Sequence, residues 1–400
     1  MAKRNGDFGR GMSKAKREEF ERKLADDFIE AIKEGKVGAF GETAWTKLGG
    51  NAMPHNPQGR PYRGINTVIL WISGFEYTSN TWGTYNAWKE VSRKHAIREK
   101  QFTVETNKDG STWKKTTEYY GVKKGEGGTT VVLWKPSAYR TEDKETGEEE
   151  IRQSVLMRYF TVFNRDQTGL PPEQTDVELE DAEDFTDTEA ELEFCLEYFI
   201  DNPFRSAKKI GDLLPDGHKA EEPCWVMKEG TPILLKHGGD RAFYTSSADR
   251  IALPLREQFD SNGAYLSVKG HEIIHSTGHP LRLNRKLGNT FGSEDYAKEE
   301  LIAEFGTAML LGSFGIQGEL RNVEYINNWA PVLAKEPRFL MTAAQRAQKA
   351  VNYVLEPWVD HVIERDEDFD RMGESLKGKT IEIDEMAHER VRVAMLEEEE

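Results

Sequence analysis

Cysteine is scarce in this sequence, which has only Cys195 and Cys224 among its 400 residues. Two distant cysteines cannot form the disulfide framework of a small secreted domain, and they suit a reducing compartment.

Long apolar runs are absent as well. The basic start MAKRNGDFGRG is followed by no apolar stretch, so we expect no signal peptide. No run approaches the length of a membrane-spanning helix, about 20 apolar residues, so we expect no membrane partner.

Charge is unevenly distributed along the chain, whose formal net charge is −16. Residues 1–140 carry 25 Lys and Arg against 16 Asp and Glu, whereas residues 141–230 carry 9 against 25. Six of the nine tryptophans also lie in the basic first block. A length of 400 residues already favours two domains. A basic, tryptophan-rich first third joined to an acidic remainder predicts that the two domains have different partners.

Hydrophobic periodicity predicts a mixture of helices and strands in the first half. An amphipathic helix is expected over residues 13–35, where an apolar residue recurs at every fourth position. The run RPYRGINTVILWISG at 60–74 predicts a buried strand or a strand–helix junction. Residues 102–135 contain a hairpin signal, NKDG, and residues 155–164 predict a further strand.

An acidic stretch opened by two prolines separates the halves, and we interpret residues 171–193 as a linker. Beyond it, residues 241–254 predict two short strands around a turn. Helices are expected over 296–311 and 323–355. The highly charged residues 361–400 are expected to form a flexible tail.

The stretch GHEIIHSTGH, residues 270–279, holds three of the nine histidines. On a helix, His271 and His275 lie one turn apart on the same face, so both imidazoles can bind one ion. Glu272 is adjacent to the first histidine, and its carboxylate can reach a water on the metal. This arrangement is typical of zinc hydrolases, in which the metal lowers the pKa of its water to about 7 and the glutamate accepts the proton.

Two sources of a third ligand are open. The metzincin pattern requires a histidine where this chain has Leu281, and His279 comes two positions too early, so we interpret His279 as a polar residue on the cleft loop. The other source is the next helix, YAKEELIAEFGTAMLLG, in which Glu304 falls inside the apolar stripe, Glu300 borders it and Glu299 points away. Two acids on a buried face are costly without a cation. One would bind the metal and the other would hold a ligand histidine, the alternative being a surface pair at the edge of the stripe.

Longer runs surround these residues. In the second half they are PILLKHGGDRAFYTSSADRIALP and GAYLSVKGHEIIHSTGHPLRLNRKLGNTFGSEDYAKEELIAEFG, and in the first half RPYRGINTVILW, TWGTYNAW, VKKGEGGTTVVLWK and YFTVFNRDQTGLP. Together they resemble the ArdC-type antirestriction proteins of plasmids and phages, whose first domain is shared with conjugative-plasmid primases. The resemblance covers roughly residues 15–355. It implies an α+β protein with an N-terminal mixed α/β domain that binds single-stranded DNA, over 13–170, and a C-terminal zincin-like metallopeptidase domain, over 194–360.

The resemblance also implies roles for individual residues. His271 and His275 match the metal ligands of the family, and Glu272 matches its catalytic acid. Glu300 is the expected third ligand and Glu304 the residue behind it, with the reverse order as the alternative. One Zn²⁺ ion per chain is expected, with another divalent transition metal as the alternative. The family motif is closer to HELxHWTGH, so a serine here replaces an aromatic residue beside the second ligand.

The first domain has the composition that a non-specific single-strand binder needs. Such proteins combine a basic groove with aromatic side chains on which bases stack. The candidate DNA-contacting residues are Arg60, Tyr62, Arg63, Trp82, Tyr85, Trp88, Lys123 and Lys124. The glycine-rich GVKKGEGG lacks the Lys-Ser/Thr ending of a nucleotide-binding P-loop, so we expect no ATP binding.

The expected function is protection of incoming phage or plasmid DNA in the cytoplasm of a bacterial host. The expected partners are single-stranded DNA and a host restriction or defence protein. Three alternatives stay open: a DNA-binding protein whose zincin domain holds its metal only for structure, an acidic mimic of DNA that titrates a restriction enzyme through residues 141–230, and a primase accessory protein.

Overall fold

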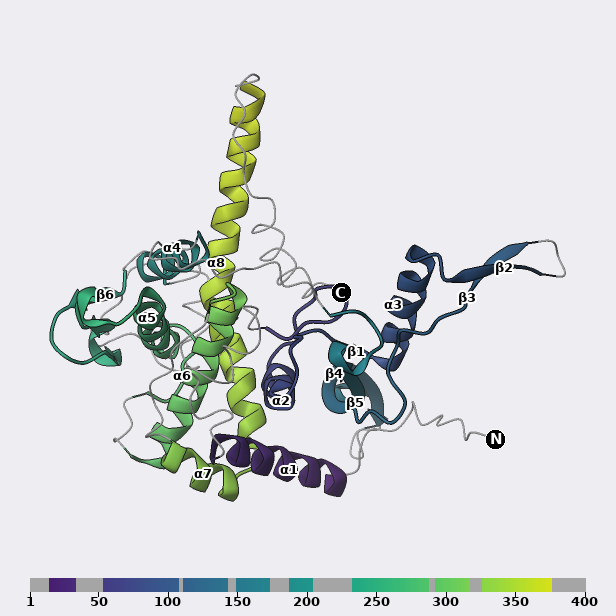
Figure 1. Ribbon diagram of the computed structural model, residues 1–400. Coiled ribbons are helices and arrows are strands. Elements are labelled where there is room, and N and C mark those ends of the chain that lie inside the picture. Colours follow the sequence, from purple (N-terminus) through teal and green to yellow (C-terminus); the bar gives the residue numbers. More distant parts are fainter. Residues whose placement is uncertain are drawn as a thin grey trace.

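The structure is a computed structural model of the chain. It describes residues 14–33, 53–107, 111–142, 149–172, 187–203, 232–287, 292–316 and 326–375. Figure 1 shows the helices of the second half gathered around the long helix α8 (Phe339–Ser375), with the strands of the first half to the right.

The amphipathic helix expected over 13–35 is confirmed as α1 (Lys14–Lys33). Leu24 and Phe28 are buried on its apolar face. The ring of Phe28 meets the ring of Phe305 edge-on, with 5.5 Å between the ring centroids. The first helix of the chain is therefore packed against a helix of the second half.

Of the two structures expected for residues 60–74, a buried strand or a strand–helix junction, the buried strand is wrong: Pro61 forms an isolated β-bridge and Ile65–Gly74 form helix α2. Most of its residues are buried, and a continuous apolar run does not distinguish a buried strand from a buried helix. The side chain of Asn66 joins this helix to a neighbouring strand. Its Nδ2 donates to the carbonyl of Val132 and its Oδ1 accepts from the amide of Val132, each over 2.7 Å.

An antiparallel sheet forms the centre of the first half, in the order β1 (Trp82–Thr84), β5 (Glu149–Asn164) and β4 (Thr129–Glu142). The strand expected over 155–164 is confirmed as the second part of β5. Helix α3 (Tyr85–Arg98) follows β1 without a break. The sheet therefore joins α2, which is bonded to β4 through Asn66, to α3, which follows β1.

A separate hairpin extends from the end of α3. It consists of β2 (Phe102–Thr106) and β3 (Thr112–Thr116), which pair antiparallel and confirm the hairpin expected around NKDG. Figure 1 shows this hairpin projecting away from the rest of the molecule.

The second half contains a small mixed sheet in the order β6 (Leu234–His237), β8 (Arg250–Leu253) and β7 (Phe243–Thr245). Strand β6 pairs parallel with β8, and β7 pairs antiparallel with β8. The two short strands expected within 241–254 are therefore confirmed.

Helices make up most of the second half. They are α4 (Asp187–Asp201), α5 (Asn262–Ser276), α6 (Glu294–Ser313), α7 (Ile326–Lys335) and α8. The tail expected over 361–400 begins as the last turns of α8. Its remainder, residues 376–400, and the acidic residues 173–186 lie outside the described residues. Within the described segments, no helix has the length and apolar character needed to cross a membrane.

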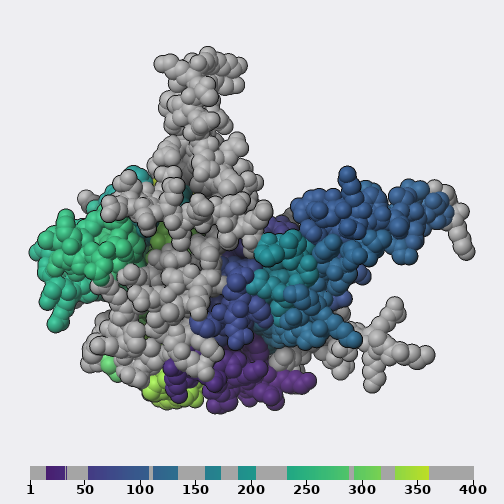
Figure 2. Space-filling view, in the orientation of Figure 1, coloured from purple at the N-terminus to yellow at the C-terminus, as the bar shows by residue number. Residues whose placement is uncertain are grey.

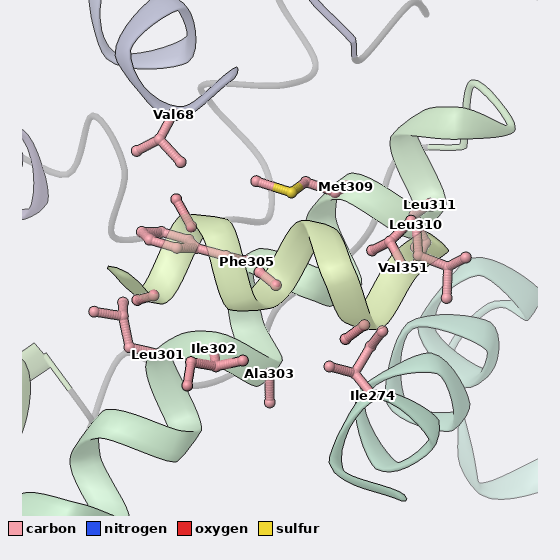
Figure 3. Close-up of a cluster of buried hydrophobic side chains, with 14 of the residues drawn as sticks. Val68, Ile274, Leu301, Ile302, Ala303, Phe305, Met309, Leu310, Leu311 and Val351 are labelled. Carbon is pink, nitrogen blue, oxygen red and sulfur yellow. The ribbon is translucent and has the colours of Figure 1, made fainter. Parts of the chain in front are cut away.

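Buried apolar side chains from both halves form one cluster, and α6 runs through it. Figure 3 shows Val68 of α2, Phe305 and Met309 of α6, Val351 of α8 and Ile274 of α5 within this cluster. Because both halves contribute to the same core, the domain boundaries inferred from the sequence stay a prediction.

Candidate metal centre

Helix α5 presents two histidines on one face. It begins after Ser261, whose hydroxyl accepts a hydrogen bond from the amide of Ala264 over 3.0 Å. The Nε2 atoms of His271 and His275 lie 3.1 Å apart, and the two rings meet edge-on. The one-turn spacing therefore directs both Nε2 atoms to a common point.

Helix α6 brings a carboxylate to the same point. Oε2 of Glu300 lies 3.5 Å from Nε2 of His271, and Oε1 lies 3.4 Å from Nε2 of His275. The ligand atoms of these three residues all lie within 4.8 Å of one another. Two imidazole nitrogens and one carboxylate oxygen are the donor set of many catalytic zinc sites.

Glu299 does not point away from the site, which corrects the expectation from the helical wheel. It is 7% exposed, and its Oε1 lies 3.3 Å from Nδ1 of His275. The guanidinium of Arg285 donates to both of its carboxylate oxygens over 2.8 to 3.2 Å. The same guanidinium donates to the carbonyl of Ile274 over 2.7 Å. Glu299 and Arg285 therefore fix the Nδ1 side of the His275 ring.

Glu304 has the equivalent position beside the other histidine. Its Oε1 lies 3.7 Å from Nδ1 of His271, and the residue is 1% exposed. This distance is too long for a direct hydrogen bond, so the carboxylate acts on the ring through its charge. The roles of Glu300 as ligand and Glu304 as the residue behind it stay predictions.

Negative charge accumulates at this buried site. Glu272, Glu299, Glu300 and Glu304 are each at most 7% exposed, and Arg285 compensates one of these charges. Burial alone would raise the pKa of Glu300, but the adjacent imidazoles outweigh it and lower that pKa. Several buried carboxylates are costly unless cations accompany them. The donor set and the charge of the site therefore fit a divalent metal ion.

Glu272 lies beside this cluster and is not part of it. Burial raises the pKa of its carboxyl, while a hydrogen bond from the backbone amide of Tyr244 favours the charged form. Tyr244 belongs to β7, so the small sheet directly contacts the residue expected to transfer protons.

A buried ion pair joins this sheet to the end of α5. Arg282 is 3% exposed, and its guanidinium donates to both carboxylate oxygens of Asp249 and to the carbonyl of Ser276. Asp249 also accepts from the hydroxyl of Tyr244 over 2.6 Å.

His279, expected on the cleft loop, is half-buried in the turn after α5 and does not join the three-residue cluster. Sequence reasoning missed Arg282 and Arg285, because both lie in a loop where no periodicity indicates burial.

In the first half, Trp82 and Trp88 are core residues, which corrects their expected role as stacking platforms. They are 1% and 0% exposed. Nε1 of Trp88 donates to the carbonyl of Phe163 over 2.8 Å, and Trp82 packs edge-on against Tyr77. A ring that is buried on both faces cannot stack on a base. Their polar neighbours in the sequence gave no sign of this burial, because Trp82 lies on β1 and Trp88 in α3, and both elements contact the distant strand β5.

The remaining DNA-contacting candidates lie nearer the surface. Tyr85 is 50% exposed, and the side chains of Arg60, Lys123 and Lys124 are also exposed, whereas Arg63 is partly buried. The hydroxyl of Tyr62 donates to a backbone carbonyl over 3.0 Å, and burial raises its pKa to about 12. The side chain of Tyr62 therefore takes part in the packing and hydrogen bonding of the fold.

Each half of the chain matches a known protein family. Residues 18–163 match the N-terminal domain of anti-restriction factor ArdC, and residues 226–346 match a zincin-like metallopeptidase. The metal-free crystal structure of antirestriction ArdC from plasmid R388 is similar to the chain, with a TM-score of 0.55 and 26% sequence identity. That similarity covers 84% of this chain and 96% of that one. The chain has the two-domain architecture of ArdC. The α+β fold and the resemblance expected from the sequence are thereby confirmed.

The Mn(II)-bound structure of the same ArdC matches with a TM-score of 0.51 and 26% identity, covering 84% of this chain and 97% of that one. A zincin-like domain and the donor set described above support a metal in the ArdC-like second half. Because that relative holds Mn(II), the similarity does not select Zn²⁺ over other divalent ions.

Curated relatives extend the comparison. Two Escherichia coli proteins named DNA primase TraC are 29% and 30% identical to the chain over 352 and 351 residues, or 84% of its length in both cases. The chain spans only 20% and 27% of the length of these primases. The protein y4eC of Sinorhizobium fredii is 28% identical over 303 residues, which cover 74% of this chain and 78% of that protein.

Proposed function

We propose that this protein is an antirestriction protein that binds single-stranded DNA through residues 13–170 and carries a zinc-dependent peptidase site in residues 194–360. It would protect phage or plasmid DNA that enters the cytoplasm of a bacterial cell. The ArdC-like architecture supports the DNA-related part. The convergence of His271, His275 and Glu300 is the observation that carries the peptidase part.

The three residues would hold one metal ion, and two further acids would support them. Glu299 fixes the His275 ring and Glu304 lies behind the His271 ring. Such outer carboxylates orient the imidazoles and raise their basicity. A divalent ion bound here would polarise a peptide carbonyl and lower the pKa of a water molecule.

Glu272 is the group to which we assign proton transfer. Its carboxylate would accept a proton from the attacking water and return it to the nitrogen of the leaving amine. Its burial keeps bulk water from competing for that proton, and the backbone of Tyr244 lies on the side of the carboxylate where it favours the charged form.

Metal analysis tests the ligand set. Purified His271→Ala, His275→Ala and Glu300→Ala variants should lose most of their zinc, because two remaining ligands rarely retain the ion. Glu304→Ala should weaken zinc binding by about 10–100-fold, as expected for an outer residue. His279→Ala is the matched control and should keep full zinc. If Glu304→Ala empties the site and Glu300→Ala does not, the two glutamates have the reverse roles.

The variant Glu272→Gln tests whether the site is catalytic. The amide preserves the shape of the side chain and cannot accept a proton, so cleavage of casein should fall by about 10²–10⁴-fold while zinc content stays constant. Glu257→Gln changes an exposed glutamate of the same half and should change nothing. Zinc-replete wild-type protein that cleaves neither casein nor a peptide library would favour a metal held only for structure.

A protection assay in a restricting bacterial host tests the biology. We expect Glu272→Gln to protect incoming DNA as well as the wild type, because a protein that coats DNA blocks another enzyme by occupancy alone. Loss of protection with unchanged zinc content and DNA binding would make proteolysis of a host restriction or defence protein the mechanism.

A further inference from the structure

Residues 85–107 and 111–124 form a basic arm that projects from the first half. The basic arm comprises α3, the strands β2 and β3 and the segment after them, and these residues include nine Lys and Arg against four Asp and Glu. Figure 1 and Figure 2 show it, in blue, extending away from the body of the molecule. Seven of the ten residues in the two hairpin strands are exposed. A two-stranded hairpin has little stability of its own, so packing does not explain the side chains it carries.

Three half-exposed aromatic rings lie on the basic arm. Tyr85, Trp113 and Tyr119 are 50%, 46% and 51% exposed. A hydrogen bond joins the side chains of Tyr85 and Tyr119, which places these two rings next to each other. The arm therefore has the exposed aromatic faces that the buried Trp82 and Trp88 cannot offer.

One face of the hairpin combines an aromatic ring with a cation. In the antiparallel register Trp113 is paired with Glu105, and Lys115 follows Trp113 on the same face because side chains alternate along a strand. Nζ of Lys115 lies 2.7 Å from Oε1 of Glu105, and the two side chains are 57% and 39% exposed. Exposed ion pairs contribute little stability, so a phosphate can displace Glu105 from this lysine at small cost.

We propose that the basic arm is a binding surface for single-stranded DNA, in which Trp113 stacks on a base and Lys115 pairs with the adjacent phosphate. The inference rests on the proposed function and names the surface that performs its DNA-binding part. Tyr85 and Tyr119 extend the stacking surface toward the body of the protein. Aromatic faces and ammonium groups accept any base sequence, so this surface binds without sequence preference.

Fluorescence anisotropy of the full-length protein with a labelled oligothymidylate tests the inference. The oligonucleotide should exceed the about 4–16 nucleotides that one single-strand-binding domain occupies. Trp113→Ala should weaken binding by roughly 5- to 150-fold, the equivalent of one lost stacking contact. Trp113→Phe should retain most of the affinity because it keeps an aromatic face. Phe194→Ala removes a more exposed ring, from α4, and should leave the affinity unchanged.

A second variant predicts a gain of affinity, which an unfolded arm cannot produce. Glu105→Gln removes a negative charge beside the expected phosphate and frees Lys115, so binding should tighten by roughly two- to fivefold at low salt. Wild-type binding that neither Trp113→Ala nor Glu105→Gln alters would overturn this inference and leave the proposed function standing. Equal, Trp113-dependent binding of blunt duplex would also overturn it. A wild-type protein that does not bind single strands would overturn the proposed function itself.

Discussion

Gly306 determines how closely α5 and α6 approach each other at the candidate metal centre. A β-carbon at this position would lie 2.7 Å from Cγ2 of Ile274 and 3.2 Å from two other atoms of that side chain. Ile274 is fully buried on α5, and a β-branched side chain in a helix has one strongly preferred χ1 rotamer, so a rotation that would move Cγ2 aside is costly. We predict that Gly306→Ala pushes the two helices apart and thereby separates Glu300 from the histidines.

The magnitude follows from these distances. An ordinary contact begins at 3.4 Å, so relief of the 2.7 Å contact requires a local separation of about 0.7 Å. Overpacking costs about 1–3 kcal/mol, and alanine returns about 1 kcal/mol in helix propensity, so the net loss of unfolding free energy is at most about 2 kcal/mol. Metal–ligand distances tolerate only about 0.2 Å. The separation should therefore reduce zinc affinity by at least tenfold, which is the smallest effect expected when a residue behind a metal ligand is changed.

Competition with a chromophoric zinc chelator measures this affinity, and thermal denaturation of the metal-free protein measures stability. Gly270→Ala is the matched control, because a β-carbon there meets its nearest atom at 3.5 Å in the same helix interface. That control should keep the zinc affinity and melt at the same temperature or higher. A Gly306→Ala protein that binds zinc as tightly as the wild type would refute the argument that this close approach positions the ligands.

Two further substitutions test the supports of the core and the site. Glu299→Gln should lower zinc affinity by about 10–100-fold without emptying the site, as measured by chelator competition; unchanged affinity would mean that His275 needs no carboxylate behind it. Phe28→Ala should lower the free energy of unfolding by about 3–5 kcal/mol in urea titration, because it removes a fully buried ring packed on Phe305. Leu133→Ala, at an exposed position of β4, is the control, and an equal loss there would show that burial is not the cause.

The parts of the site that the sequence predicted are those defined by local spacing. His271 and His275 share a face of α5 because four residues separate them, whatever surrounds the helix. Glu299 was misplaced because a helical wheel assumes that one side of a helix faces solvent. Arg285 is a long-range partner from a loop, and no local pattern indicates which carboxylate a loop arginine reaches.

The errors in the first half have the same physical origin. The run at Ile65–Gly74 is largely apolar and largely buried because β4, α1 and α8 all contact it, so its period was not visible. Trp82 and Trp88 have polar neighbours in the sequence, but side chains on opposite sides of a strand–helix corner can differ completely in burial. In both regions, burial was set by distant segments of the chain.

Helix α6 explains why the candidate centre depends on the whole molecule. One side of the helix carries Glu299, Glu300 and Glu304 toward the histidines, while Phe305 belongs to the core shared with the first half. Phe28 of α1 packs on that ring from the other half. The carboxylates are therefore held in place from behind by segments that precede them by more than two hundred residues. Buried acids that repel one another stay close only if the surrounding packing prevents their retreat. The contact between the halves thus contributes directly to keeping the donor set assembled before a metal binds.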